Sequence, residues 1–139
     1  MNIFRFIRPK SSVEYIYDTS TVRQALEKMR YHRYVAIPVI SEDGVYVGTL
    51  RSEDIFKYFV DNKKYSARAA EGDKVTKILD KEHLRPLLHS ASVEELFDMA
   101  SEHNFAPVVD DRNCFIGLVL RRDVLDFLIN YYKTRESEE

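Results

Sequence analysis

Two aspartates, Asp54 and Asp123, stand at matching places in two similar segments of the chain. Each follows a glycine by six residues, in GTLRSEDIF (residues 48–56) and GLVLRRDVL (residues 117–125), at the expected start of a helix. An ionised carboxylate can accept hydrogen bonds from both hydroxyls of a ribose, and the N–H groups of a helix start can meet a phosphate. Aspartate is also favoured in a first helical turn by the helix dipole alone. The spacing therefore leaves two interpretations open, a binding cleft with two related halves and an ordinary helix start.

Arginines accompany both aspartates. Arg51 stands three residues before Asp54, and Arg121 and Arg122 directly precede Asp123. A guanidinium group matches the geometry of a phosphate and forms strong charge-assisted hydrogen bonds with it. The alternative for two adjacent arginines at a helix start is a solvated face. If the pair does bind an anion, the second segment carries the stronger site.

The other reactive side chains do not form a catalytic or metal-binding set. The four histidines have no i,i+4 spacing on one helix, and Cys114 is the single cysteine, within an apolar run. Catalysis would require a nucleophile with its base, and zinc would require a set of ligands. We therefore predict no enzyme activity, no metal site and no catalytic cofactor. We expect Cys114 to be a small core residue in a reducing compartment.

The composition is that of an ordinary globular protein long enough for one compact domain. The 139 residues include 21 basic and 23 acidic side chains, for a formal net charge of −2. No overall basic field is present to attract nucleic acid or an anionic membrane. The apolar stretch at the N-terminus is too short for a signal peptide or a membrane span. We therefore expect a soluble, cytoplasmic protein that binds neither nucleic acid nor membrane.

The chain contains an internal repeat. Thr21 matches Ser92 at an offset of 71 residues, whereas Pro38 matches Pro107 at an offset of 69. Such self-similarity at a fixed interval indicates repeated structural units. The second copy has lost two residues between its first helix and the strand that contains the proline. We place the first repeat, with a lead-in segment, at residues 1–66, and the second, with a connector and a charged tail, at 67–139.

Each copy begins with the same two predicted elements. A short strand is followed by a capping box, which starts a helix with one apolar face. The strands are at residues 13–17 and 84–88, and the boxes pair Thr21 with Gln24 and Ser92 with Glu95.

A hairpin and a second helix complete each copy. An apolar run with an internal proline (residues 36–40 or 105–109) predicts a strand at a sheet edge or a strand start. A polar turn joins it to the glycine-containing strand, and the glycine lets that strand approach a ligand or a neighbouring segment closely. The sequence thus predicts an α+β fold of two β-α-β-β-α halves, joined by a polar connector at residues 61–72.

This order of motifs resembles the CBS domain, and its duplication resembles a CBS pair, or Bateman module, of the small stand-alone bacterial type. The resemblance covers residues 9–132. It implies two pseudo-symmetric repeats packed as one module, with two clefts that commonly hold adenine nucleotides, and a sensor rather than a catalyst. The family has a serine or threonine three residues before the aspartate, where this chain has Arg51 and Leu120.

In the family each cleft takes its aspartate from one repeat and its base-binding wall from the other. The resemblance implies a cleft A formed by Glu14, Ile16, Tyr34, Val35, Ala36, Ile37, Pro38, Arg121, Arg122 and Asp123. It implies a weaker cleft B formed by Arg51, Asp54, Arg85, Asn104 and Ala106. Ala36 leaves room for a planar base, whereas Phe105 at the matching place could fill that slot itself. We therefore expect one dominant nucleotide site, in cleft A.

The resemblance also implies how the ligand lies. Adenine is expected along residues 35–37 and ribose at Asp123, with phosphate at Arg121 or Arg122.

Three functions fit this fold and stay open. The first is a regulatory module that binds an adenine nucleotide (AMP, ADP or ATP) as a regulatory ligand and signals to an unidentified effector protein. The second is a cyclic di-AMP receptor, since some small bacterial CBS-pair proteins are similar in the wall at residues 36–39 and in the arginine pair. The third is a protein-interaction module with vestigial clefts, suggested by the missing hydroxyls and by Phe105.

The second helices carry more apolar residues than one buried face requires. The excess residues lie beside the main stripe: Phe56 and Val60 in the first copy, and Leu125, Ile129 and Tyr132 in the second. CBS pairs often dimerise through such helices. We therefore expect a homodimer.

Overall fold

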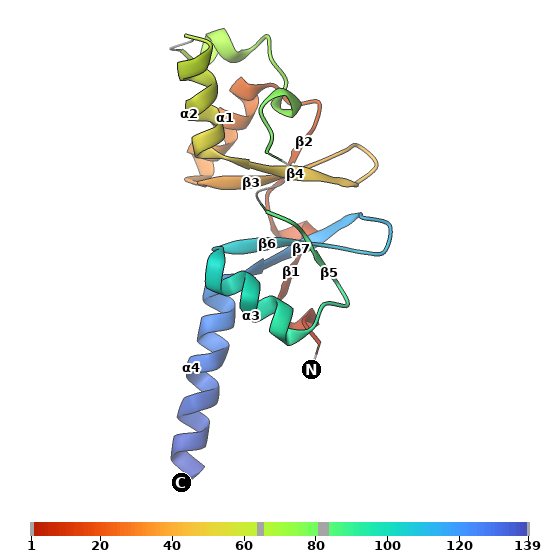
Figure 1. Ribbon diagram of the computed structural model, residues 1–139, viewed down its shortest axis with the longest axis vertical. Coiled ribbons are helices and arrows are strands. Elements are labelled where there is room, and N and C mark those ends of the chain that lie inside the picture. Colours follow the sequence, from red (N-terminus) through yellow and green to blue (C-terminus); the bar gives the residue numbers. More distant parts are fainter. Residues whose placement is uncertain (1, 64–65, 81–83, 139) are drawn as a thin grey trace. The chain divides into compact units, whose positions relative to one another are not determined.

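The computed structural model describes residues 2–63, 66–80 and 84–138 (Figure 1). They form two compact units, which are described one at a time. The repeat-1 unit is Glu14–Arg85, and the repeat-2 unit combines Met1–Val13 with Pro86–Glu139. The lead-in segment therefore packs with the second repeat, although it precedes the first in the sequence.

The repeat-1 unit has a three-stranded sheet with two helices on one side (Figure 1). Its elements are β2 (Ile16–Tyr17), α1 (Val22–His32), β3 (Ala36–Ile40), β4 (Tyr46–Arg51), α2 (Ser52–Asp61) and the short 3₁₀ turns η3 (Ala67–Ala70) and η4 (Val75–Lys77). The strand order is β2-β3-β4, with β2 parallel and β4 antiparallel to β3. Strand β2 is shorter than the strand predicted at residues 13–17.

The repeat-2 unit repeats this arrangement and adds one strand. Its elements are η1 (Phe4–Phe6), β1 (Ile7–Pro9), η2 (Lys10–Ser12), β5 (Leu87–Leu88), α3 (Val93–Glu102), β6 (Phe105–Val109), β7 (Phe115–Leu120) and α4 (Arg121–Glu138). The strand order is β1-β7-β6-β5. The α+β prediction of two like halves is confirmed. Helix α4, with 18 residues, is longer than α3, with 10 residues (Figure 1).

The two prolines lie in central strands, so the prediction that they mark a sheet edge or a strand start is wrong. Pro38 pairs with Thr49 in the middle of β3, and Pro107 pairs with Leu118 in β6. A proline cannot donate a hydrogen bond to a neighbouring strand. It is tolerated here because β2 and β5 are two residues long, and their pairs with β3 and β6 begin one residue beyond each proline.

Thr21 and Ser92 cap the first helices of the two repeats as predicted, and the full two-bond capping box is present at Thr21. Thr21 Oγ1 accepts from the backbone N–H of Gln24 at 3.1 Å, and Gln24 Oε1 accepts from the N–H of Thr21 at 2.9 Å. Ser92 Oγ likewise accepts from the N–H of Glu95 at 3.1 Å. These bonds satisfy N–H groups that the first helical turn leaves without a backbone partner.

The segment after α2, predicted to be a polar connector, contributes to the core of the repeat-1 unit. Ala70 in η3 and Val75 in η4 are fully buried against α1 and the sheet. The N–H of Val22 donates to the carbonyl of Asp73 at 2.8 Å, which ties this segment to the start of α1. Part of the connector, residues 64–65, lies outside the described residues.

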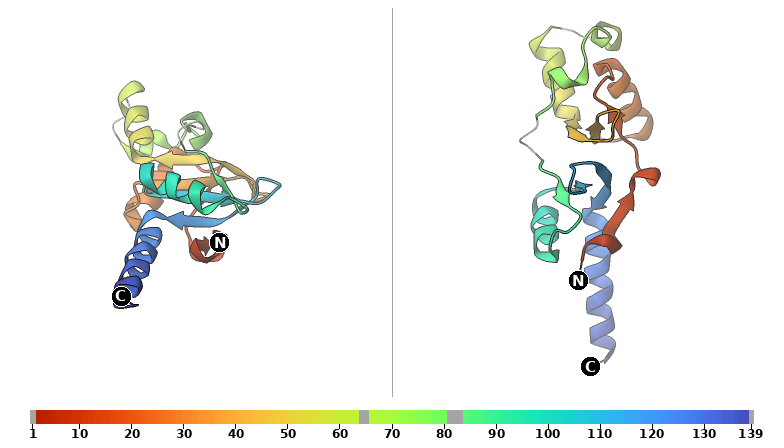
Figure 2. Two further views of the ribbon diagram at one scale, coloured as in Figure 1. Left: turned by 60° about the horizontal axis from the view of Figure 1, so that its bottom comes forward. Right: turned by 90° about the vertical axis from the view of Figure 1, so that its right-hand side faces the viewer.

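The lead-in segment is built into the repeat-2 unit. Strand β1 runs antiparallel to β7, with Arg8 opposite Leu118 and Pro9 opposite Gly117 (Figures 1 and 2). Ile3 and Phe6 are buried in the same core as α3, β6 and β7. The ring of Phe6 meets that of Phe127 edge-on, with centroids 5.3 Å apart. Edge pairing and buried side chains therefore hold this segment in place.

Candidate functional site

Asp123, in the first turn of α4, is bound by an arginine from the lead-in strand. Arg8 Nε donates to Asp123 Oδ2 at 2.8 Å, and Arg8 Nη2 donates to Oδ1 at 2.9 Å. This fork-on-carboxylate geometry is the strongest form of a side-chain ion pair. The hydrogen bonds from Arg8 hold the pKa of Asp123 below its ordinary value, so the carboxylate is ionised at neutral pH.

A pocket of about 540 Å³ opens beside this ion pair within the repeat-2 unit. Its lining combines charged, amide, hydroxyl and aromatic side chains from the lead-in segment and from one face of α4. The lining residues are Arg5, Phe6, Ile7, Arg8, Asp123, Asp126, Phe127, Asn130, Tyr131 and Thr134. Such a mixture offers apolar contact area together with several hydrogen-bonding groups, and its share of charged side chains suits a polar, charged ligand.

Gly117 allows the lead-in strand to reach this position. A Cβ atom at Gly117 would overlap the carbonyl oxygen of Arg8 and lie 2.9 Å from Ile7 Cγ2. The expectation of a close approach at this glycine is confirmed, and the approaching group is a neighbouring strand.

Arg121 is held within the repeat-2 unit. Its Nε donates to the carbonyl of Ala100 at 2.7 Å, and its Nη1 donates to Asn104 Oδ1 at 3.1 Å. The side chain thus joins the start of α4 to the last turn of α3 and to the loop between α3 and β6. Arg122, the second arginine of the pair, is exposed. A contact of either arginine with phosphate stays a prediction.

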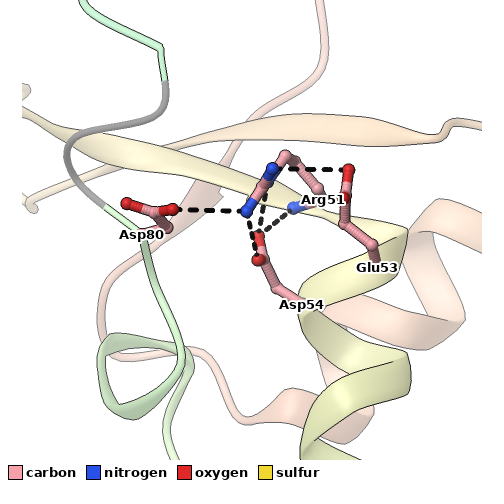
Figure 3. Close-up of polar contacts among 4 residues, drawn as sticks. All are labelled: Arg51, Glu53, Asp54 and Asp80. Atoms are coloured by element: carbon pink, nitrogen blue, oxygen red, sulfur yellow. Dashed lines mark hydrogen bonds and ion pairs between the residues drawn. The ribbon is translucent and has the colours of Figure 1, made fainter.

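Asp54, the matching aspartate of the repeat-1 unit, also has an arginine fork (Figure 3). Arg51 Nε donates to Asp54 Oδ2 at 3.1 Å, and Arg51 Nη2 donates to Oδ1 at 2.7 Å. The backbone N–H of Arg51 donates to the same carboxylate at 2.9 Å. This arginine comes from the end of β4, at the place where the family has its hydroxyl.

Two further carboxylates surround Arg51. Glu53 Oε1 lies 3.4 Å from Arg51 Nη1, and Asp80 Oδ2 lies 3.4 Å from Arg51 Nη2 (Figure 3). The hydrogen bonds with Asp54, together with these charges, raise the pKa of Arg51 above its ordinary value. The cluster carries more negative than positive charge.

The two aspartates differ in accessibility. The side chain of Asp54 is 9% exposed beneath Arg51, which is itself 17% exposed. The side chain of Asp123 is 26% exposed and that of Arg8 42%. A ligand therefore reaches Asp123 more readily than Asp54.

A second pocket, of about 530 Å³, lies beside Asp54 in the repeat-1 unit. It is lined by more charged groups than the pocket at Asp123. Its residues are Arg51, Asp54, Lys57, Tyr58, Asp61, Asn62, Lys77, Ile78, Leu79 and Asp80. These charges already pair in part with one another, as the Arg51 cluster shows.

The predicted wall of cleft A lies in the repeat-1 unit and divides into core and surface. Ile16, Ile37 and Pro38 are buried, whereas Tyr34 and Val35 are exposed and Ala36 is half-buried. Ile16 comes from the short strand β2, Tyr34 and Val35 from the approach to β3, and the other three from β3 itself.

Glu14 and Tyr34 belong to a polar and aromatic cluster at the end of α1. Glu14 Oε2 lies 3.0 Å from Lys28 Nζ, and this hydrogen bond lowers the pKa of Glu14. Glu14 Oε1 lies 3.7 Å from His32 Nε2. The ring of Tyr34 stacks on His32 with centroids 5.2 Å apart. The exposed part of the wall is therefore aromatic and polar.

The predicted partners of cleft B have other surroundings. Ala106 is fully buried in β6, Asn104 accepts from Arg121, and Arg85 is exposed. Phe105, expected to fill the base slot, is half-buried.

Sequence reasoning did not find Arg8 or Asp80 as site residues. Arg8 lies in the lead-in segment, and Asp80 lies in the segment that connects the two repeats. Arg8 contacts Asp123, and Asp80 contacts Arg51. The repeat offset of 71 residues places Arg8 opposite Leu79 and Pro9 opposite Asp80, so the repeat itself gave no signal for either charged residue.

Two further features bear on the chemistry of the described residues. Among them, no group of three or more histidine, cysteine, aspartate or glutamate side chains is arranged to hold a metal ion. Within the same residues, no helix is both long enough and apolar enough to cross a membrane.

Comparison with known proteins identifies the family. The CBS domain profile matches residues 6–61 and 79–130. The uncharacterized protein MJ1225 of Methanocaldococcus jannaschii is 30% identical over an aligned length of 135 residues, and the match covers 88% of this chain and 47% of that protein. The chain thus spans about half the length of this curated relative.

Solved structures share the fold. CbpB in complex with c-di-AMP superposes with a TM-score of 0.90 at 19% identity, over 100% of this chain and 91% of that one. CbpB of Listeria monocytogenes in complex with c-di-AMP gives 0.82 at 20% identity, over 92% and 95% of the two chains. CBSX2 in complex with AMP gives 0.74 at 19% identity, over 94% and 98%. The chain belongs to the CBS domain family and carries two CBS domains in tandem, a Bateman module.

Proposed function

We propose that this chain is a non-catalytic sensor that binds an adenine nucleotide and passes its state of occupancy to another protein. The observation that carries the proposal is the accessible, ionised Asp123 beside a pocket of about 540 Å³. A carboxylate of this kind can accept hydrogen bonds from both hydroxyls of a ribose. The arginines nearby can neutralise a phosphate.

The pocket at Asp123 is the better of the two candidates. Asp54 is covered by Arg51, and Arg51 is held by two more carboxylates. A ligand that displaced Arg51 from Asp54 would also have to break its contacts with Glu53 and Asp80. The proposed ribose site is therefore Asp123, and the wall at residues 34–38 stays a prediction for the base.

A second candidate ligand is c-di-AMP. Support comes from CbpB, which shares the fold over the whole of this chain and whose structure contains c-di-AMP. This ligand also presents adenine, ribose and phosphate, so the same carboxylate and arginines suit its chemistry.

We also propose that the protein is a homodimer. Phe56 and Val60 on α2 occupy the same repeat positions as Leu125 and Ile129 on α4, and all four side chains are exposed. Tyr132 extends the α4 set by one turn. Such exposed apolar faces suit self-association. In a two-fold dimer the same faces of both subunits would be buried against each other.

Titration calorimetry with AMP, ADP, ATP and c-di-AMP, with GMP as the control for the base, tests the proposed function. We expect at least one adenine ligand to bind in the micromolar range and GMP to bind more weakly. Tighter binding of c-di-AMP than of AMP would favour the second candidate. Absence of binding below millimolar for every adenine ligand would contradict the proposal.

A further inference from the structure

We propose that Arg8 makes the Asp123 site select phosphorylated over unphosphorylated nucleosides, by occupying the carboxylate until a phosphate draws its guanidinium away. This inference rests on the proposed function, and it assigns a role in specificity to a lead-in residue. It starts from the hydrogen bonds between Arg8 and Asp123.

The arginine uses the same oxygens that a ribose would use. Arg8 binds Oδ1 and Oδ2 of Asp123 side-on, at 2.9 and 2.8 Å. A ribose that donates its two adjacent hydroxyls to one carboxylate approaches the same edge of that group. Ribose and guanidinium therefore compete for Asp123.

The exchange requires movement of a side chain only. The side chain of Arg8 is 42% exposed, so water can rehydrate its guanidinium as it leaves the carboxylate, and this lowers the cost of breaking even a two-bonded pair. The backbone of Arg8 stays fixed, since Ile3 and Phe6 are buried and β1 pairs with β7. The guanidinium can thus leave the carboxylate while its strand remains in place.

The corresponding ion pair in the repeat-1 unit, between Arg51 and Asp54, is held more firmly. Arg51 is the last residue of β4, is 17% exposed and has Glu53 and Asp80 as additional partners. Displacing it would separate one guanidinium from three carboxylates. The difference between the two units restricts the exchange to Asp123.

A phosphate compensates for the broken ion pair. The phosphate of a nucleotide is attached to the same ribose that would bind Asp123, so the released guanidinium has an anion within reach. Guanidinium binds phosphate with the same fork geometry that it uses for carboxylate. A nucleoside without phosphate would break the Arg8–Asp123 pair and leave the guanidinium without an anionic partner.

The test compares the dissociation constants of adenosine and AMP for the wild-type chain and for Arg8→Gln. The measured quantity is the ratio of the adenosine constant to the AMP constant. We expect this ratio to fall by about tenfold or more in Arg8→Gln, as for the loss of one charge-assisted hydrogen bond. Part of the fall should come from tighter binding of adenosine, because Asp123 is then free.

Arg112→Gln is the matched control. Arg112 is an exposed arginine in the turn between β6 and β7, outside the pocket lining, and its loss changes the net charge equally. The control should keep the wild-type ratio. Circular dichroism of all three proteins shows whether each is folded.

The outcomes separate this inference from the proposed function. If both ligands bind and the ratio is the same in wild type and Arg8→Gln, the role of Arg8 is wrong and the proposed function stands. A weaker binding of adenosine by Arg8→Gln would also overturn it, because the arginine would then assist the ribose. If neither ligand, nor ATP nor c-di-AMP, binds any of the proteins, the proposed function fails and this inference with it.

Discussion

Gly117 in β7 and Arg8 in β1 approach so closely that a single methyl group on the glycine would overlap the arginine's carbonyl oxygen. The glycine therefore sets the position of the lead-in strand, and the strand sets the position of the guanidinium on Asp123. A chain segment that precedes the first repeat is in this way attached to the proposed ligand site of the second.

Gly117→Ala should displace β1 and destabilise the repeat-2 unit by about 1–3 kcal/mol, as overpacking of a well-packed site does. The measurement is the free energy of unfolding in urea. Gly72→Ala is the control, because a Cβ there meets no atom within 4 Å. Equal stability of the two variants would show that β1 does not need the space at Gly117.

Arg8→Gln should lower stability at neutral pH by about 0.5–1 kcal/mol, the range for exposed ion pairs with good geometry. The folded-state pKa of Asp123 is lowered, so the wild-type advantage is fully present above the unfolded-state pKa of about 3.9 and is lost as the pH falls through the folded-state value. Urea unfolding of both proteins from pH 7 to pH 3 measures this difference. A difference that stays constant down to pH 3 would contradict the assigned ion pair.

Leu125→Glu combined with Ile129→Glu should convert the proposed homodimer into a monomer, because two charges would be buried in an apolar interface. Light scattering of the wild type should give twice the chain mass of 16.4 kDa. Tyr31→Glu is the control, since Tyr31 is exposed on α1 and is not among the residues of the proposed interface. A monomeric wild type at micromolar concentration, or a dimer that tolerates both glutamates, would remove the dimer proposal.

The fold was predictable because its signals are local. Capping boxes, apolar periodicity and the duplicated glycine-to-aspartate segment all lie within short windows, and the structure confirms the elements that they predict. The prediction for the prolines is wrong because a proline fits into a central strand where the neighbouring strand is short. The sequence does not show the length of that neighbouring strand.

The site was predictable only in part, because its strongest contact is not local. Asp123 was identified from its position after Gly117, but its partner Arg8 lies 115 residues away and reaches it through the pairing of β1 with β7. Arg121 was expected at the phosphate because of its charge. The structure shows Arg121 bonded to the carbonyl of Ala100 and to Asn104, partners that the sequence pattern does not display, and its contact with phosphate stays a prediction.

The central claim is that the nucleotide site lies at Asp123 and not at its repeat counterpart Asp54. Calorimetry with the tightest-binding adenine ligand should show a loss of about 1–3 kcal/mol in binding free energy for Asp123→Ala, as expected for removal of a charged hydrogen-bond partner. Asp54→Ala should change binding little, because Arg51 keeps Glu53 and Asp80 as partners and the pocket at Asp123 is untouched. A larger loss for Asp54→Ala than for Asp123→Ala, with both variants folded, would contradict the account.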